Sequence, residues 1–407
     1  MQKGYLKVSV YLDTVATPIE NANVLVEGEN YSGNFKTNVH GKTGLIALDA
    51  PDKKYSEYPQ YEIKPYAQYN LTITKSGFNT VKINKVEIFA EETALQDVYM
   101  KKEPGATDII DMPEHELWES HGEYMPENDL YNDYAPKEEL IRILPRTVIP
   151  EYIRVKNGVP TSNAAVLTVP FIDYIKNVTS SEIFSTWHPE AIKANVHAIV
   201  SFTLNRIYTE WYPSRGFNFT ITASPAHDQM FINGRAIYQS ISNVVDQYFN
   251  QYIRLTGRNS PFFAQYNDGI NTNIPGRLSQ WGSQNRALTG QSAIQILRHF
   301  YTPNLALHTA AQVVGLPNSF PGFDLRLGSC GQFVQDLQNR LNRIRTHFPG
   351  IPVITPTNGW YNESTRRSVE TFQRVFNIPV TGVVNWATWF RISNIFTAVA
   401  GLQEGAR

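Results

Sequence analysis

Cysteine, basic charge and long apolar runs are all scarce in this 407-residue sequence. A single cysteine, Cys330, excludes an intrachain disulfide and a cysteine-rich metal site. Lysine and arginine number 36 against 37 aspartates and glutamates, so no basic field exists to hold a nucleic acid. No stretch approaches the roughly 20 apolar residues of a membrane helix. The histidines show no HExxH or comparable spacing, so the sequence predicts neither a metal centre nor a cofactor.

The first residues also lack the pattern of a signal peptide. Met1 to Val8 alternate polar and apolar residues, without the apolar run of about 7–15 residues that a signal peptide carries. We therefore expect an exported form to use another route or a different mature start.

Aromatic residues, by contrast, are plentiful. They make up 12% of the chain, with 22 tyrosines and 7 tryptophans, which suits both β-sheet cores and stacking on sugar rings. Hydrophobic residues at 42% and charged residues at 18% are typical of a globular protein, and the length predicts two to four domains.

Residues 1–102 are predicted to form a β-sandwich of about seven strands. Apolar residues alternate with period two in short segments separated by Gly- and Pro-containing breaks, at 6–12, 22–26, 44–48, 69–74 and 81–83. The order of "TNVHGKTGLIAL" and "YNLTITKSGFNTV" resembles the transthyretin-like or carboxypeptidase-regulatory sandwich. That resemblance implies a non-catalytic domain.

Residues 103–147 have the composition of a linker. Acidic residues and prolines cluster there, with little periodic apolar content. We expect this segment to be extended and accessible, with a processing site near Arg146, Thr147 and Val148. A passive spacer is the alternative.

The rest of the chain divides into a mixed α+β region, 148–322, and a helical region, 323–407. In the first, His188 and Pro189 begin a long amphipathic helix, and residues 292–301 predict another. In the second, two apolar faces around 332–345 and 362–376 predict a three-helix module.

The helical module resembles the peptidoglycan-binding domain of cell-wall hydrolases. The matching positions are Leu327, Gly328, Gly331, Val334, Leu337, Gln338, Leu341, Gly359, Thr365, Val369, Phe372, Gln373, Gly382, Thr388 and Trp389. The resemblance implies binding to sugar or stem peptide. A generic helical bundle is the alternative.

The central region resembles the stage II sporulation protein D family of lytic transglycosylases, through residues 169–198 and 276–301. "LNRIYTEWYPSRGFNFTITASPAHDQMF" and "FFAQYNDG" are similar to SleC-type spore cortex-lytic enzymes, which share the flanking domains. This implies a precursor whose sandwich and linker are removed by an activating protease, and a place in the spore cortex or extracellular cell wall. The chain departs from the family pattern at Asn267 and Ile274, where the family has cysteines, and at an inserted Arg277.

The implied reaction needs one carboxyl group, because the nucleophile is the substrate's own muramic C6 hydroxyl. Glu182 matches the family's glutamate in "SSEI" and has apolar neighbours, so we predict that it is catalytic. The alternative for Glu182 is a helix-end charge. Glu190 is the second candidate, although its place behind Pro189 suits a first-turn acid. Asp173 is expected to be a solvated surface charge.

Groups that hold the sugar are expected to offer fixed donors and flat faces. By motif position the candidates are Asp228, Gln229, Gln265, Tyr266, Ser279, Gln280 and Trp281. For each of them, packing or turn formation is an equally open interpretation.

The sequence thus predicts a peptidoglycan lytic transglycosylase that acts on glycan strands. Two alternatives remain open: a wall-binding or structural protein without a working cleft, which the altered 267–277 loop favours, and a wall-penetrating part of a phage or secretion device.

Overall fold

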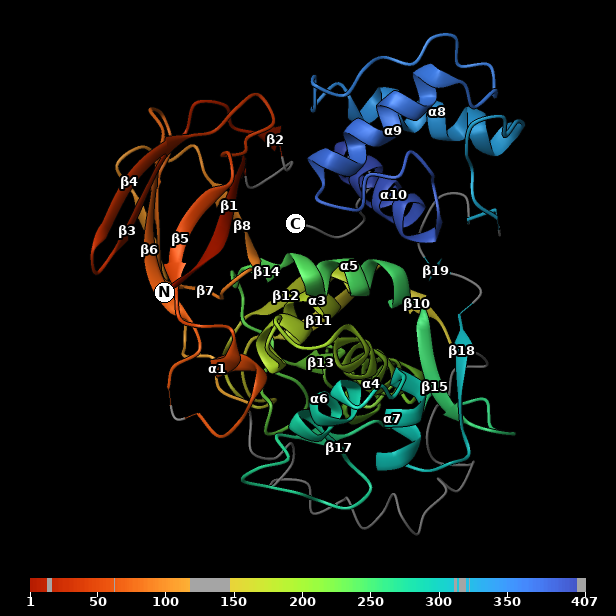
Figure 1. Ribbon diagram of the computed structural model, residues 1–407. Coiled ribbons are helices and arrows are strands. Elements are labelled where there is room, and N and C mark those ends of the chain that lie inside the picture. The colour runs from red at the N-terminus through yellow and green to blue at the C-terminus, as the bar shows by residue number, and fades with distance from the viewer. Residues whose placement is uncertain are drawn as a thin grey trace.

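The computed structural model describes residues 1–12, 17–61, 63–117, 147–310, 313–314, 320–321 and 323–400. Figure 1 shows a β-rich N-terminal part, a mixed central part and a helical C-terminal part. The chain is therefore multidomain, with a sheet-rich start and a helical end. The expected linker lies mostly in residues 118–146, outside the described residues, as does Arg146 of the expected processing site.

Two sheets form the N-terminal part. One contains β1 (Gln2–Leu12), β2 (Thr17–Pro18), β5 (Ile46–Ala50) and β8 (Thr93–Met100). The other has the order β4 (Tyr31–Lys36), β3 (Asn23–Gly28), β6 (Ala67–Thr74), β7 (Thr80–Ile88) and β9 (Thr107–Asp111). Their apolar alternation buries one face of each strand, as in β5, where Ile46, Leu48 and Ala50 are buried and Ala47 and Asp49 are exposed. A short helix, α1 (Lys54–Glu57), follows β5.

Strand β9 lies where the sequence predicts only linker. It pairs in parallel with β7, so the β-rich part extends past residue 102. Two of its acidic residues accept hydrogen bonds from asparagines: Asn79 Nδ2 lies 2.9 Å from Asp108, and Asn84 Nδ2 lies 2.6 Å from Asp111. The acidic composition therefore does not indicate a linker at 107–111, because these carboxylates accept hydrogen bonds at the edge of a sheet.

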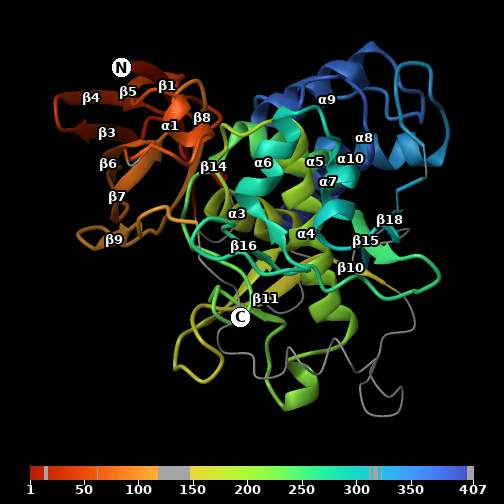
Figure 2. The ribbon, with the colours of Figure 1, turned by 60° about the horizontal axis from the view of Figure 1, so that its bottom comes forward.

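The N-terminal and central parts share a sheet. Strand β14 (Ile237–Tyr238) pairs antiparallel with β8, and in Figures 1 and 2 it lies beside β8 where the two parts meet. One continuous set of buried apolar side chains runs from Val8 through Phe89 to Phe184 and Ile199. The two parts therefore fold around a common core.

The central part surrounds helix α4 (Pro189–Tyr208) with shorter elements. Its sheets join β11 (Tyr152–Lys156) to β12 (Val166–Pro170) and β13 (Ile221–Thr222), β15 (Gln251–Leu255) to β18 (Leu305–Thr309), β16 (Tyr266–Asn267) to β17 (Leu278–Ser279), and β10 (Ile149–Pro150) to β19 (Val313–Val314). Its other helices are α3 (Phe171–Glu182), α5 (Gln239–Tyr248), α6 (Gln280–Leu288) and α7 (Ala293–Phe300). Helix α4 begins at the predicted residue, where the His188 side chain accepts a hydrogen bond from the Glu190 amide.

Three helices form the C-terminal part: α8 (Gln332–Ile344), α9 (Glu363–Val375) and α10 (Trp386–Ala400). They enclose an apolar core that includes Val334, Leu341 and Phe372, and Tyr11 of β1 packs into it. The Asn362 side chain caps α9 by accepting a hydrogen bond from the Thr365 amide. The three-helix prediction agrees with this arrangement. In the described part of the chain, no helix has the length and apolar character needed to cross a membrane.

Candidate functional site

Glu182 lies at the C-terminal end of α3, and its side chain is completely buried. Its Oε1 accepts hydrogen bonds from the Met230 amide at 2.7 Å and from the Tyr266 hydroxyl at 3.1 Å. Its main-chain oxygen accepts a third from Gln280 Nε2 at 3.1 Å. Three segments distant in sequence therefore converge on this glutamate, and two of the three donors, Tyr266 and Gln280, are predicted site residues.

A second layer of polar side chains surrounds Tyr266. Gln229 Oε1 accepts hydrogen bonds from Tyr174 at 3.1 Å and from Thr203 at 2.8 Å. Burial, reinforced by the nearby Glu182 carboxylate, raises the pKa of Tyr266 well above its ordinary value, so its hydroxyl keeps its proton. Tyr266 is thereby a hydrogen-bond donor to Glu182 over the whole physiological pH range.

Asp228 occupies a different place from the one expected for a sugar ligand. It is completely buried and pairs with Arg206 at 2.8 Å. It also accepts hydrogen bonds from Tyr212 at 2.6 Å and from the Thr222 hydroxyl at 2.7 Å. A carboxylate with this many internal partners ties β13 to α4, so its role in this structure is structural.

The remaining predicted binding residues make hydrogen bonds within the protein or line a pocket. Ser279 accepts a hydrogen bond from the Gly282 amide and so caps α6, and the Gln265 main chain accepts one from Tyr301. Gln280 supports Glu182 as described above. Trp281 lines one pocket together with Phe184, and Ser279 also lines a second pocket with Gly282 and Phe300.

The two other acidic candidates have structural partners. Glu190 Oε2 accepts a hydrogen bond of 2.6 Å from the Ala293 amide, at the start of α7. This agrees with its interpretation as a helix-associated charge. Asp173 is partly exposed, and it pairs at 2.9 Å with Arg391 of α10. The two residues lie more than 200 positions apart in the sequence, so no local sequence pattern predicts this ion pair.

The altered loop is closed without cysteines. Asn267 pairs with Ser279 in the short β16–β17 ladder, and Asp268 accepts hydrogen bonds from the Asn271 and Thr272 amides. Gly269 has φ +80°, and a Cβ there would lie 1.8 Å from Ser279 Oγ. Backbone turns and the close approach of Gly269 to Ser279 thus hold the loop next to Tyr266 and Gln280, which donate hydrogen bonds to Glu182.

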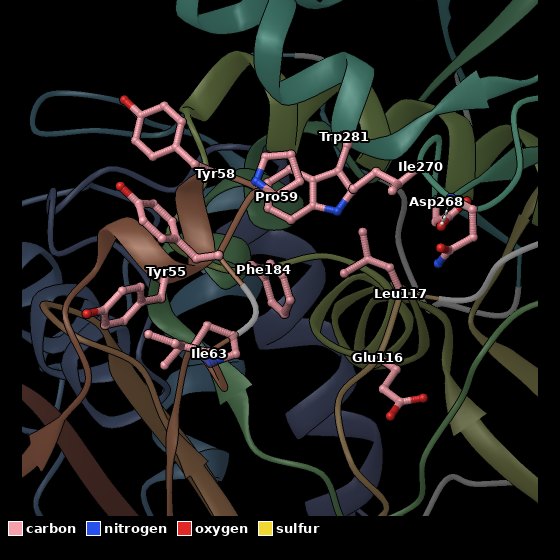
Figure 3. Close-up of a pocket in the computed structure, with 13 residues that line it drawn as sticks. Tyr55, Tyr58, Pro59, Ile63, Glu116, Leu117, Phe184, Asp268, Ile270 and Trp281 are labelled. Carbon is pink, nitrogen blue, oxygen red and sulfur yellow. Dashed lines mark hydrogen bonds between the residues drawn. The ribbon is translucent and has the colours of Figure 1, made fainter.

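A pocket of about 310 Å³ lies beside this loop (Figure 3). Phe184, Trp281, Asp268, Ile270 and Asn271 form its central-region wall. The other wall was not predicted from sequence, and it comes from the N-terminal part: Tyr55, Tyr58, Pro59, Tyr61, Ile63, Pro65, Glu116 and Leu117. The one signal for it was the tyrosine-rich segment "KYSEYPQY" between predicted strands.

Residues 330–392 match the family model described as a putative peptidoglycan-binding domain. This agrees with the resemblance noted from the sequence and makes the C-terminal helical part a peptidoglycan-binding domain, which supports association with the cell wall. No curated protein matches the chain.

Solved structures show only weak likeness. The Bacillus anthracis TIE protein is 19% identical over 25% of this chain and 16% of its own, with a TM-score of 0.18. A cohesin–X-dockerin complex from Acetivibrio cellulolyticus, a C-terminal interface mutant, is 15% identical over 26% of this chain and 56% of its own, with a TM-score of 0.16. The chain spans about a sixth to just over half the length of these proteins.

Proposed function

We propose that this protein is a lytic transglycosylase of peptidoglycan, with Glu182 as its single acid and base. The observation that carries the proposal is the environment of Glu182: a buried carboxyl group held by Met230 and Tyr266. Gln280 binds its main chain, and the adjacent Trp281 lines the aromatic pocket. The peptidoglycan-binding domain in the same chain supports the choice of substrate.

In the proposed reaction, Glu182 donates a proton to the glycosidic oxygen as the bond from that oxygen to C1 of the muramic residue breaks. The C6 hydroxyl of the same residue then attacks C1, and Glu182 takes up the hydroxyl proton. The products are a 1,6-anhydromuramic end and a free hydroxyl on the leaving sugar. No water is consumed, so a second carboxylate is not needed.

The proposed reaction requires that the substrate reach a carboxyl group that is buried in this structure. The Glu182 side chain has no exposed surface, and Tyr266 donates to the same oxygen that accepts from Met230. The substrate can therefore reach the carboxyl only after some of the surrounding segments move. Apo active sites commonly tighten or rearrange when substrate binds.

The test compares Glu182→Gln with Glu190→Gln on purified sacculi. We expect Glu182→Gln to lower the formation of anhydromuramic ends by at least about 100-fold, because an amide cannot shuttle the proton. Glu190→Gln should retain most activity, since Glu190 contacts the α7 amide rather than the site. Mass spectrometry of released fragments gives the readout, and unfolding temperatures check both folds. Near-normal turnover by Glu182→Gln would refute the assignment.

Spore cortex is the proposed substrate within this class, and this choice rests on the resemblance to SleC-type enzymes. A comparison of cortex fragments with vegetative sacculi tests it: faster release from cortex supports it, and equal rates would oppose it.

A non-catalytic wall-binding protein is the second candidate function. The complete burial of Glu182 and the departures at Asn267, Ile274 and Arg277 favour it. It predicts that the wild-type chain sediments with sacculi yet produces no anhydromuramic ends under any condition, including with cortex.

A further inference from the structure

The pocket beside the Glu182 site has one wall that belongs to a different part of the molecule. Helix α1 and the segment after it supply three tyrosines, Tyr55, Tyr58 and Tyr61, and the last two are 40% and 38% exposed. The opposite wall consists of Phe184, Trp281 and the 268–271 turn. In Figure 3, Tyr55, Tyr58 and Ile63 lie on one side of Phe184 and Ile270 and Asp268 on the other.

The N-terminal wall is fixed in place by buried hydrogen bonds. Trp187 Nε1 donates to the Ser56 main-chain oxygen at 2.8 Å, and the Thr186 hydroxyl donates to Ser56 Oγ at 2.7 Å. Ser56 lies within α1 and is completely buried. The tyrosines that follow it are therefore anchored to the segment that connects Glu182 with α4. The pocket exists only because the two parts are docked.

The chemistry of the lining selects an uncharged, polyhydroxylated ligand. Tyrosine, tryptophan and phenylalanine rings offer flat apolar faces, and Glu116, Asp268 and Asn271 offer polar groups at the edge. Among the described lining residues there is no lysine or arginine, so an anionic group would meet two carboxylates without a compensating cation. Its volume lies at the lower end of the range of small-ligand pockets, about 300–1,000 Å³.

We propose that this composite pocket binds one uncharged N-acetylhexosamine unit of the glycan strand, with half of its wall supplied by the N-terminal part. The proposal rests on the proposed function for its choice of a glycan strand. Under this proposal the N-terminal part helps to determine the specificity of the site and is not a removable pro-region. A peptide-free muramic residue, whose lactyl group carries a carboxylate, is disfavoured at this position by Glu116 and Asp268.

Hydrogen exchange on the intact protein tests the proposal locally. The probes are two stem-peptide-free tetrasaccharides, one of N-acetylglucosamine alone and one alternating it with N-acetylmuramic acid. We expect both to slow exchange in residues 54–61 and 268–281. Tyr58→Ala should weaken this protection about fivefold to tenfold, as loss of an aromatic contact commonly does. Tyr31→Ala on β4 is the matched control, because Tyr31 lies outside the pocket.

The outcomes separate this proposal from the proposed function. Protection confined to 323–392, or unchanged protection in a folded Tyr58→Ala protein, would overturn the pocket assignment even if the wild type cuts sacculi. Protection in the pocket with loss in Tyr58→Ala, but no anhydromuramic ends, would uphold the pocket and refute the enzyme. Stronger protection of the pocket by the alternating tetrasaccharide than by the N-acetylglucosamine tetrasaccharide would overturn the charge argument.

Discussion

The two ends of the chain join the central part in different ways. The N-terminal part shares a sheet with it through β8 and β14, and it contributes Glu87 to a buried cluster with Arg235 of the central part. His115 and Tyr238 lie 3.2 Å and 3.3 Å from the same Glu87 oxygen. Both parts contribute to one apolar core, so each part would expose buried apolar side chains to water if the other were removed.

The C-terminal part keeps most of its core to itself and meets its neighbours at fewer points. Tyr11 of β1 joins that core, and Ala387 and Phe390 of α10 belong to the core of the other two parts. Among the polar contacts, Lys7 and Gln239 both reach Asn377, and Asp173 pairs with Arg391. Phe249 makes aromatic contacts with Phe390 and Trp386, with ring centroids 4.9 Å and 6.2 Å apart. We therefore expect the C-terminal part to be the more stable of the two ends by itself. Both ends looked like appendages in the sequence, yet only one is.

Deleting each end in turn should give the largest contrast. A chain of residues 147–407 loses β8, the partner of β14, and leaves Arg235 without Glu87. We expect it to aggregate or to lack a cooperative transition. A chain of residues 1–322 should remain folded, because the removed module buries most of its apolar residues in a second cluster. Soluble yield and thermal unfolding measure both, and a cooperative 147–407 protein would contradict the shared-core interpretation.

Breaking one ion pair at each junction sharpens the same comparison. Glu87→Ala should lower the free energy of unfolding by about 3–5 kcal/mol, because it leaves Arg235 buried without its partner. Asp173→Ala should cost less than about 1 kcal/mol, since the Asp173 side chain is 37% exposed. Urea unfolding of both variants gives the values. Equal losses would show that the two junctions are equivalent.

A pH-dependent contact also links the N-terminal part to the C-terminal module. Lys42 is buried against the main-chain oxygen of Val375, and burial lowers its pKa from 10.5 to about 7. In the unfolded chain Lys42 keeps its ordinary pKa, so unfolding takes up a proton between about pH 7 and pH 10. Rising pH should therefore stabilise the folded protein across this interval.

Replacing Lys42 with methionine should remove this part of the pH dependence. We expect the unfolding temperature of Lys42→Met to rise less from pH 7 to pH 9 than that of the wild type. Lys3→Met is the control, because Lys3 pairs with Asp49 at the surface. Parallel pH profiles for wild type and Lys42→Met would contradict a neutralised buried lysine.

The smallest effect is expected from a chain break between the first two parts. A site-specific protease sequence inserted between residues 132 and 133 allows a clean cut. Because β8, β14 and the Glu87 cluster bind the pieces together, both fragments should co-elute from a sizing column at the position of the intact protein. Any activity on sacculi should persist. Separation of the fragments without denaturant would restore the idea of a removable pro-region.

Local patterns were enough to predict several elements. The apolar spacing and Pro189 located the start of α4, and Asn362 with its following apolar face located α9. The alternation of short strands indicated the sheet-rich N-terminal part. The order of positions from Leu327 to Trp389 indicated the peptidoglycan-binding domain. The signals for α4, α9 and the strands are carried by residues within a few positions of one another, where periodicity and capping act.

Tertiary structure alone decided what those elements build together. The pairing of β8 with β14 joins residues more than 130 positions apart, and Ser56 meets Trp187 across a similar distance. Asp228, expected at the sugar, became a buried partner of Arg206, while Tyr58 became part of a pocket wall. Such outcomes depend on which surfaces exclude water from one another, and a residue type at a motif position does not carry that information.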